Sequence, residues 1–222
     1  MLAIPILFII LLGPLLASFW VKHNFKKYSQ VANAKAISGR EVAEAILERN
    51  GLSVVSVHPV SGTLSDCYSS GRKKCVCLSD EVYSGQSIAA LAVAAHECGH
   101  ALQDRDAYTF MRFRSAFYPV LRFVDKAGYV AIVIGMFFPF LGLDLVGVAM
   151  VFCTLIFEVI TLPVEFDASR RALQVLKEME LVGEAENDGV RAVLRSAALT
   201  YVAGMLSTLF TLLRMLSRSR SR

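Results

Sequence analysis

The sequence predicts a mainly α-helical protein that passes through a membrane several times and carries a small α+β domain. Of its 222 residues, 55% are hydrophobic and 19% are charged, and the mean hydropathy is +0.52. This composition is too apolar for an ordinary soluble domain, yet it holds too many charges for membrane spans alone. We therefore expect membrane helices combined with one modest soluble part, in a single domain over residues 1–222.

Four apolar segments are candidates for the membrane part, because a helix of about 20 residues crosses a hydrocarbon core of about 30 Å. They lie at about residues 2–20, 127–143, 145–164 and 196–213, and they leave soluble parts at about 21–126 and 165–195. The first segment lacks a basic start and a clear cleavage site, so we expect an anchor and not a cleaved signal peptide. The connection between the second and third segments is short enough only for a helical hairpin.

Basic residues follow the first apolar segment closely, at Lys22, Lys26, Lys27, Lys35 and Arg40. Since loops rich in Lys and Arg stay on the cytoplasmic side, we expect a multi-pass protein of the cell membrane whose soluble parts face the cytoplasm. The fourth segment precedes a basic tail. If this segment crosses the membrane, the tail lies outside the cell, where the positive-inside rule disfavours basic residues. Whether this segment spans the membrane or lies on anionic lipid is left open.

The soluble part begins with the pattern of one helix followed by short strands. Ser38 and Glu41 form a capping-box pattern for an amphipathic helix that ends near Asn50. Strand patterns follow at residues 54–60, 63–68 and 73–78, with Pro59 at the end or edge of the first strand. We expect a small sheet whose edge can accept an extended peptide.

A metal-binding pattern follows directly after an apolar run at residues 87–95. His96 and His100 are four positions apart, so on a helix both imidazoles lie on one face and can reach a single ion. Glu97 neighbours that face, which suits a carboxylate acting on metal-bound water. Gly99 is costly inside a helix, and its presence indicates that something packs or binds close to the backbone there.

Two histidines leave a catalytic zinc site one ligand short, because catalytic zinc takes three protein ligands and keeps one position for water. Position favours Glu165, which we expect to open a helix at the cytoplasmic end of the third apolar segment. The alternative is that Glu165 is a first-turn carboxylate that only interacts favourably with the helix dipole.

The five cysteines leave several possibilities open. Cys67, Cys75 and Cys77 flank an expected hairpin turn and permit a cross-hairpin disulfide, a second metal site or reduced thiols. A cytoplasmic location favours reduced thiols. Cys98, on the helix face opposite the two histidines, and Cys153, inside the third apolar segment, are expected to pack.

The chain resembles the neutral zinc metallopeptidases of bacterial membranes, the YugP-like family, over nearly its whole length. The matching stretches are residues 87–103 around the histidine pair, 162–173 around Glu165, and 60–62 with 64–66 before the hairpin. This resemblance implies a zinc ion bound by His96, His100 and Glu165, with Glu97 as the catalytic base.

The arrangement is more distantly similar to the membrane heat-shock and CAAX prenyl peptidases. In those proteins an aspartate follows the glutamate ligand by four positions. Here that position is Ser169, while Asp167 lies two positions after Glu165. The difference leaves open which groups orient the histidine rings, since outer partners normally do so.

We therefore predict a membrane-bound, zinc-dependent endopeptidase with a zincin-like domain. It would hydrolyse peptide bonds of peptide or membrane-protein substrates through zinc-activated water, with Glu97 as general base. Candidate donors to the developing oxyanion are Arg170, Arg171 and His58, without a ranking. The lipid bilayer is an expected partner, and a net charge of +4 needs no nucleic acid to explain it.

Two other function classes remain open from the sequence. One is a site-2-type intramembrane protease, for which Asp144 would be the third ligand. The other is a non-catalytic zinc-binding membrane scaffold, which a fourth ligand such as Cys67 or Cys77 would favour. Glu158, inside the third apolar segment, is either a functional acid within the membrane or a side chain that reaches the interface.

Overall fold

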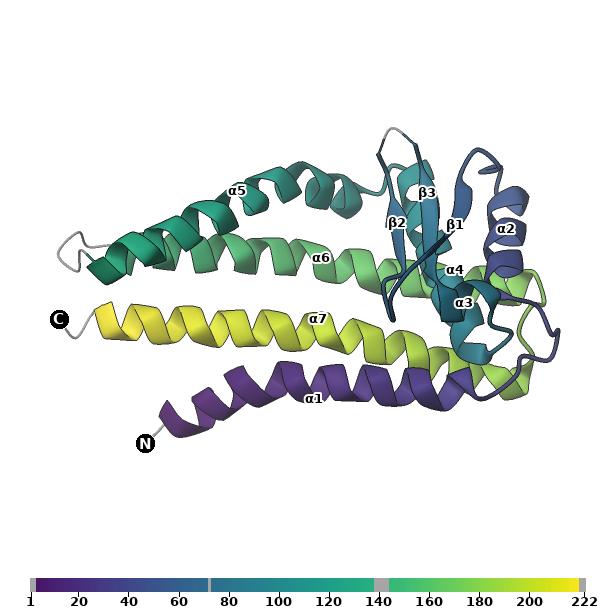
Figure 1. Cartoon of the computed structure of the whole chain (residues 1–222), viewed down its shortest axis with the longest axis horizontal. Helices are drawn as coiled ribbons and strands as arrows, with labels where there is room; N and C mark the ends of the chain where they lie inside the picture. The colour runs from purple at the N-terminus through teal and green to yellow at the C-terminus, as the bar shows by residue number, and fades with distance from the viewer. Residues whose placement is uncertain (1–2, 72, 138–143, 220–222) are drawn as a thin grey trace. The chain divides into compact units, whose positions relative to one another are not determined.

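A computed structural model describes residues 3–71, 73–137 and 144–219 of the chain. It is mainly helical with one small three-stranded sheet, as the sequence predicts (Figure 1). The elements in chain order are α1 (Ala3–Ser29), α2 (Gly39–Arg49), β1 (Ser56–Val60), β2 (Cys67–Ser69), β3 (Cys75–Ser79), α3 (Asp80–Ser84), α4 (Ile88–Arg105), α5 (Thr109–Phe137), α6 (Asp144–Glu178) and α7 (Glu184–Ser219).

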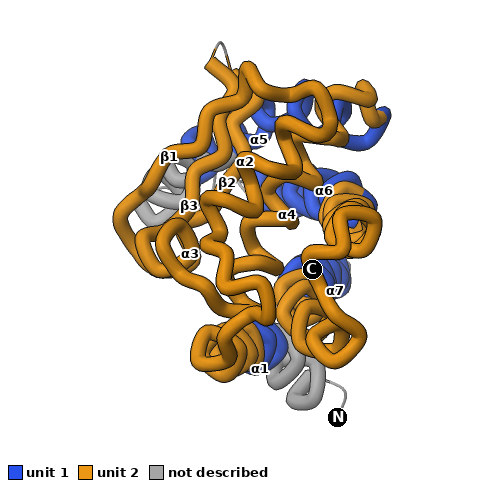
Figure 2. The backbone as a smooth tube through the Cα atoms, turned by 90° about the vertical axis from the view of Figure 1, so that its right-hand side faces the viewer, with its two compact units in different colours: residues 1–18, 109–163, 200–222 blue, residues 19–108, 164–199 orange. Residues whose placement is uncertain are grey.

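The chain forms two compact units, coloured separately in Figure 2. Unit 1 comprises residues 1–18, 109–163 and 200–222, and unit 2 comprises residues 19–108 and 164–199. All four predicted apolar segments fall largely in unit 1. The sheet, α2, α3 and α4 belong to unit 2, while α1, α6 and α7 contribute residues to both units.

Two of the described helical segments are long and apolar enough to cross a membrane, by length and composition: Val146–Glu178 and Glu184–Ser217. They coincide with the third and fourth predicted apolar segments. The first predicted segment lies in α1 from Ala3 onward. The second lies in α5 up to Phe137, and residues 138–143 lie outside the described part. Membrane crossing by these two segments, and the hairpin between the second and third, stay predictions.

The sheet of unit 2 has the order β1-β3-β2, with β1 parallel and β2 antiparallel to β3. Pro59 lies in β1, an edge strand, as expected for a residue that cannot donate to the ladder. The expected hairpin is confirmed, because β2 and β3 pair Cys67 with Cys77 and Ser69 with Cys75.

The second strand begins at Cys67 and not near residue 63, so this predicted boundary was wrong. Leu64 adopts a left-handed φ of 56°, which breaks the extended pattern. Asp66 instead holds the hairpin, since its Oδ1 accepts a hydrogen bond of 2.7 Å from the backbone N–H of Ser79. A side chain that satisfies a backbone donor in this way gives the segment an alternative to strand pairing.

The predicted cap of α2 is confirmed. Ser38 Oγ accepts from the backbone N–H of Glu41 at 3.2 Å, and Glu41 accepts from the backbone N–H of Ser38 at 2.7 Å. This reciprocal pair satisfies two backbone donors that a helix start otherwise leaves free. The helix ends at Arg49 with Asn50 as its cap, as predicted.

The metal-pattern helix α4 begins after Ser87, whose Oγ accepts from the backbone N–H of Ala90 at 3.1 Å. Its apolar side chains join those of α2 and β3 in the core of unit 2. Cys98 is fully buried there, with its sulfur 3.7 Å from the carbonyl oxygen of Ala43. Its predicted packing role is therefore confirmed.

Glu165 does not open a helix, contrary to our expectation. It lies inside α6, which runs without a break from Asp144 to Glu178 and includes Pro163. A proline removes one backbone hydrogen bond and can kink a helix without ending it. The interpretation of Glu165 as a first-turn carboxylate therefore fails.

Gly99 marks a close approach between α4 and α6. A Cβ atom at this position would lie 2.5 Å from the carbonyl oxygen and 3.1 Å from the Cα of Ala168. Ala168 is itself fully buried. The prediction that something packs against the backbone at Gly99 is confirmed, and that neighbour is the backbone of α6 three residues after Glu165.

We expect Gly99→Ala to destabilise the protein by about 1–3 kcal/mol, the usual range for overpacking a tight contact. It should also lower the zinc content, because α6 must move away from α4. Thermal unfolding in detergent and zinc analysis of the same samples measure both effects.

Gly13→Ala is the matched control, since no heavy atom lies within 4 Å of a Cβ built at Gly13 in α1. It should leave stability unchanged or raise it by up to about 1 kcal/mol through helix propensity. Equal behaviour of the two variants would show that the Gly99 contact does not constrain the helices.

Candidate metal centre

Three potential metal ligands from α4 and α6 converge in unit 2. The ligand atoms of His96, His100 and Glu165 all lie within 4.8 Å of one another. Glu165 Oε2 is 3.3 Å from Nε2 of His96 and 3.7 Å from Nε2 of His100. The two imidazole rings are 4.8 Å apart at their centroids and nearly perpendicular, at 81°.

The donor set fits a zinc ion. Nitrogen and oxygen ligands about 2.0–2.2 Å from a tetrahedral zinc lie about 3.3–3.6 Å from each other. The two distances to Glu165 Oε2, 3.3 and 3.7 Å, are close to that spacing. Among the described residues no cysteine belongs to this group, so the set is a two-imidazole, one-carboxylate chelate.

Glu97 stands beside the three donors without being one of them. Its side chain is buried, and burial raises the pKa of the Glu97 carboxyl above its usual range, although His96 and His100 act in the opposite direction. A carboxyl whose pKa is moved toward neutrality can both accept and return a proton near neutral pH.

His100 carries a raised pKa for a different reason. Burial alone would lower the pKa of its imidazole, but the hydrogen bond to Glu165 and the charge of Glu97 outweigh burial. The carboxylates of Glu165 and Glu97 therefore favour a positive charge on the His100 imidazole. A cation bound there would satisfy the same attraction.

Ser169 is the hydrogen-bond partner that orients the His96 ring. Its Oγ lies 3.2 Å from Nδ1 of His96, and a hydroxyl can accept a hydrogen bond from the N–H at that nitrogen. Nε2 of His96 is then left with a free lone pair directed toward Glu165.

Gln103 holds the His100 ring and links α4 to α6. It is fully buried, and its Nε2 donates to the backbone oxygen of Val164 at 2.7 Å and to Asp167 Oδ2 at 3.0 Å. Because both acceptors take the amide N–H groups, the amide oxygen must face His100 Nδ1, 3.0 Å away. Nδ1 therefore carries the proton, and Nε2 is free to bind a metal.

Arginine side chains anchor this network at its outer end. Asp167 accepts from Arg171 Nε at 2.6 Å and also pairs with Arg170. Arg171 further contacts Asp106 and the ring of Tyr108. No role for Asp167 was predicted from the sequence. In the structure its carboxylate accepts a hydrogen bond from Gln103, and two guanidinium groups neutralise its charge.

The sequence reasoning missed Gln103. The sequence did hold a signal for a contact between Gln103 and His100, because a residue three positions after His100 lies on the same helix face. The acceptors that fix its amide come from α6, however, and the α4 sequence alone does not indicate them.

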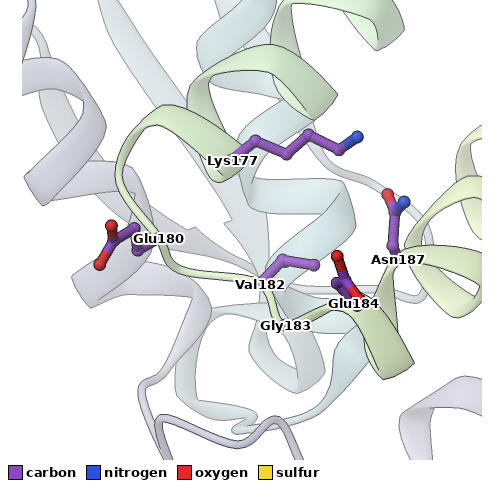
Figure 3. Close-up of a pocket in the computed structure, with 6 residues that line it drawn as sticks. All are labelled: Lys177, Glu180, Val182, Gly183, Glu184 and Asn187. Carbon is purple, nitrogen blue, oxygen red and sulfur yellow. The ribbon is translucent and has the colours of Figure 1, made fainter.

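Among the other residues named from the sequence, those whose side chains are described do not belong to the group of three donors. The side chain of Asp144 is not among those that the structure describes. Glu158, in unit 1, accepts a hydrogen bond of 3.1 Å from Thr208 on α7. A pocket of about 380 Å³ at the α6–α7 turn, shown in Figure 3, is lined by residues that include Lys177, Glu184 and Asn187 and none of the three donors.

We expect Gln103→Leu to lower zinc affinity by about 10–100-fold, the usual cost of losing an outer partner of a metal-bound histidine. The reason is that His100 loses the acceptor that fixes its tautomer. Competition against a chromophoric chelator measures the affinity. Gln174→Leu is the control, because Gln174 is exposed and bonds only Glu178 on its own helix; an equal loss there would remove the special role of Gln103.

Comparison with known proteins agrees with this donor set. Residues 3–220 match the family model described as "Putative neutral zinc metallopeptidase". The chain is 44% identical over 198 residues to "Putative membrane protease YugP" of Bacillus subtilis (strain 168), which covers 89% of this chain and 88% of that protein. No solved structure gives a significant match. Because the family model spans nearly the whole sequence, the chain belongs to the neutral zinc metallopeptidase family.

Proposed function

We propose that this protein is a membrane-bound zinc endopeptidase with His96, His100 and Glu165 as zinc ligands and Glu97 as general base. The observation that carries the proposal is the convergence of two imidazole Nε2 atoms on Glu165 Oε2, at 3.3 and 3.7 Å. Hydrogen bonds to Nδ1 of each ring support the same assignment, because they leave both Nε2 atoms available.

When bound, zinc supplies a Lewis acid that polarises the scissile carbonyl and makes water acidic enough to attack near neutral pH. The chain's own task is then proton transfer. Glu97 takes a proton from the attacking water on its carboxylate and returns it to the nitrogen of the leaving amine. Its burial, and the raised pKa that follows from it, suit a group that must hold the proton between the two steps.

The sheet offers a way to hold an extended substrate. In the order β1-β3-β2, strand β2 pairs with β3 on one side only, and it also contacts α4. A peptide backbone can add to such an open edge by main-chain hydrogen bonds. We therefore propose peptide or membrane-protein segments in extended conformation as substrates.

The donor to the oxyanion is still unassigned among the three candidates. Arg170 and Arg171 both pair with Asp167, which favours a role in anchoring the Gln103 network. His58 lies in β1, where it pairs with Cys77.

A location in the cell membrane is supported by the relative named as a membrane protease and by two helices of sufficient length and apolarity. The predicted apolar segments fall largely in unit 1. This division supports a peptidase that consists of a membrane part and a soluble part. The basic residues after the first segment support a cytoplasmic active site.

We expect detergent-purified wild type and Glu97→Gln to hold about one zinc per chain, and Glu165→Ala to lose most of it. Glu97→Gln should lower peptidase activity by about 10²–10⁴-fold, because general base catalysis is lost while the metal stays. Zinc analysis and cleavage of an unstructured protein substrate measure the two effects.

Asp144→Ala separates the site-2-type alternative from our proposal. It should retain zinc if Glu165 is the third ligand, and lose it if Asp144 is. Full zinc in Glu165→Ala would contradict the assignment, and full activity in Glu97→Gln would contradict the role of the base. Zinc without activity in every condition would favour the scaffold alternative.

A further inference from the structure

Three of the five cysteines lie on one face of the β2–β3 hairpin. Along β3 the fully buried Val76 and Leu78 alternate with Cys75 and Cys77, so the two cysteines point to the opposite face from the core. Cys67 is the direct partner of Cys77 across the hairpin. Directly paired residues share a face, so all three thiols are on the side of the sheet away from its apolar contacts.

The register of the parallel strand adds a histidine to this face. β1 pairs His58 with Cys77, so Cys77 stands between His58 on one side and Cys67 on the other. Neighbouring strands are about 4.8 Å apart, a separation that side chains of this length can bridge through one ion. His58 and Cys67 are exposed, and Cys75 and Cys77 are partly exposed, so an ion can enter from solvent.

The sulfur spacing suits a metal. Cys75 Sγ and Cys77 Sγ are 3.8 Å apart, and two thiolates bound to one tetrahedral zinc at about 2.3 Å lie about 3.8 Å from each other. A disulfide bond is far shorter, at about 2.05 Å, and no disulfide involves these residues. The two thiols are in hydrogen-bond contact, and their spacing allows both sulfurs to bind one ion without moving apart.

We propose that this face is a second metal site, built from other residues than the zinc centre proposed above, that binds a soft, thiophilic ion such as Cd²⁺. Cys75 and Cys77 are the first two ligands, because their sulfurs already lie together. Among the described residues, the ligand atoms of Cys67 and His58 do not yet form a close group with them. These two side chains must turn toward the ion to complete a three-sulfur, one-nitrogen set of the kind found in structural zinc sites. The site uses sulfur donors and the catalytic centre uses none, so the two sites differ in metal preference.

Binding at this face exchanges protons for the metal. Burial raises the pKa of the three thiols above their usual value, so they are protonated at neutral pH in the free protein. Each thiol that binds the ion releases its proton to solvent and binds as a thiolate.

The test is a Cd²⁺ titration of the zinc-loaded, full-length protein in detergent, followed by the ultraviolet charge-transfer absorption of thiolate-bound cadmium. We expect a saturable band at one Cd²⁺ per chain in wild type. Cys77→Ser, which removes the central ligand, should lose the band, and Cys153→Ser, a cysteine of α6, should keep it. His58→Ala should keep a sulfur band with affinity lowered by at least about tenfold.

Metal exchange at the catalytic centre cannot produce this band, because that centre has no sulfur donor. The proposal is overturned if wild type shows no band, or if Cys77→Ser shows the wild-type band. Should Cys77→Ser fail to fold, alkylation of wild type decides. Cd²⁺ must protect Cys67, Cys75 and Cys77 from maleimide, and equal labelling with and without Cd²⁺ overturns the proposal.

Discussion

The contact between Gly99 and the backbone of Ala168 is the constraint on which the proposed metal centre depends. One helix supplies two imidazoles and another supplies a carboxylate, and the three donors can share an ion only if the helix backbones come very close. A side chain as small as a methyl group at position 99 would meet the Ala168 carbonyl oxygen at 2.5 Å. The glycine inside the metal motif is therefore there for packing as much as for chemistry, and its helix-propensity cost of about 1 kcal/mol is offset by the site it permits.

Close approach alone does not orient the donors, and the buried hydrogen bonds provide the second constraint. Gln103 contacts His100 on its own helix and Val164 and Asp167 on the other. Arg170 and Arg171 favour the ionised form of Asp167. Asp167 and the backbone oxygen of Val164 accept the N–H groups of the Gln103 amide. The amide oxygen then accepts a hydrogen bond from Nδ1 of His100, which fixes the proton at that nitrogen. The side chains of Gln103 and Asp167 are both hydrogen-bonded within this network, which rigidifies the site. Ser169 performs the matching task for His96.

Local patterns in the sequence predicted much of this arrangement. The Ser38–Glu41 cap, the histidine pair, the packing of Cys98 and the close neighbour of Gly99 depend on residues a few positions apart, and each has a short-range physical signature. The start of β2 and the start of a helix at Glu165 were wrong, because Asp66 bonds to distant Ser79 and because α6 continues through Pro163. Gln103 was missed for the same reason, since its acceptors lie about sixty positions later in the chain.

The most direct test of the account is zinc K-edge X-ray absorption on a variant in which Cys67, Cys75 and Cys77 are all replaced by serine, loaded with one zinc per chain. We expect two imidazoles and carboxylate or water oxygen at about 2.0–2.2 Å from the zinc. A variant that no longer retains zinc, or a spectrum without imidazole scattering, would show that the thiols are the true ligands and would contradict the His96, His100 and Glu165 centre.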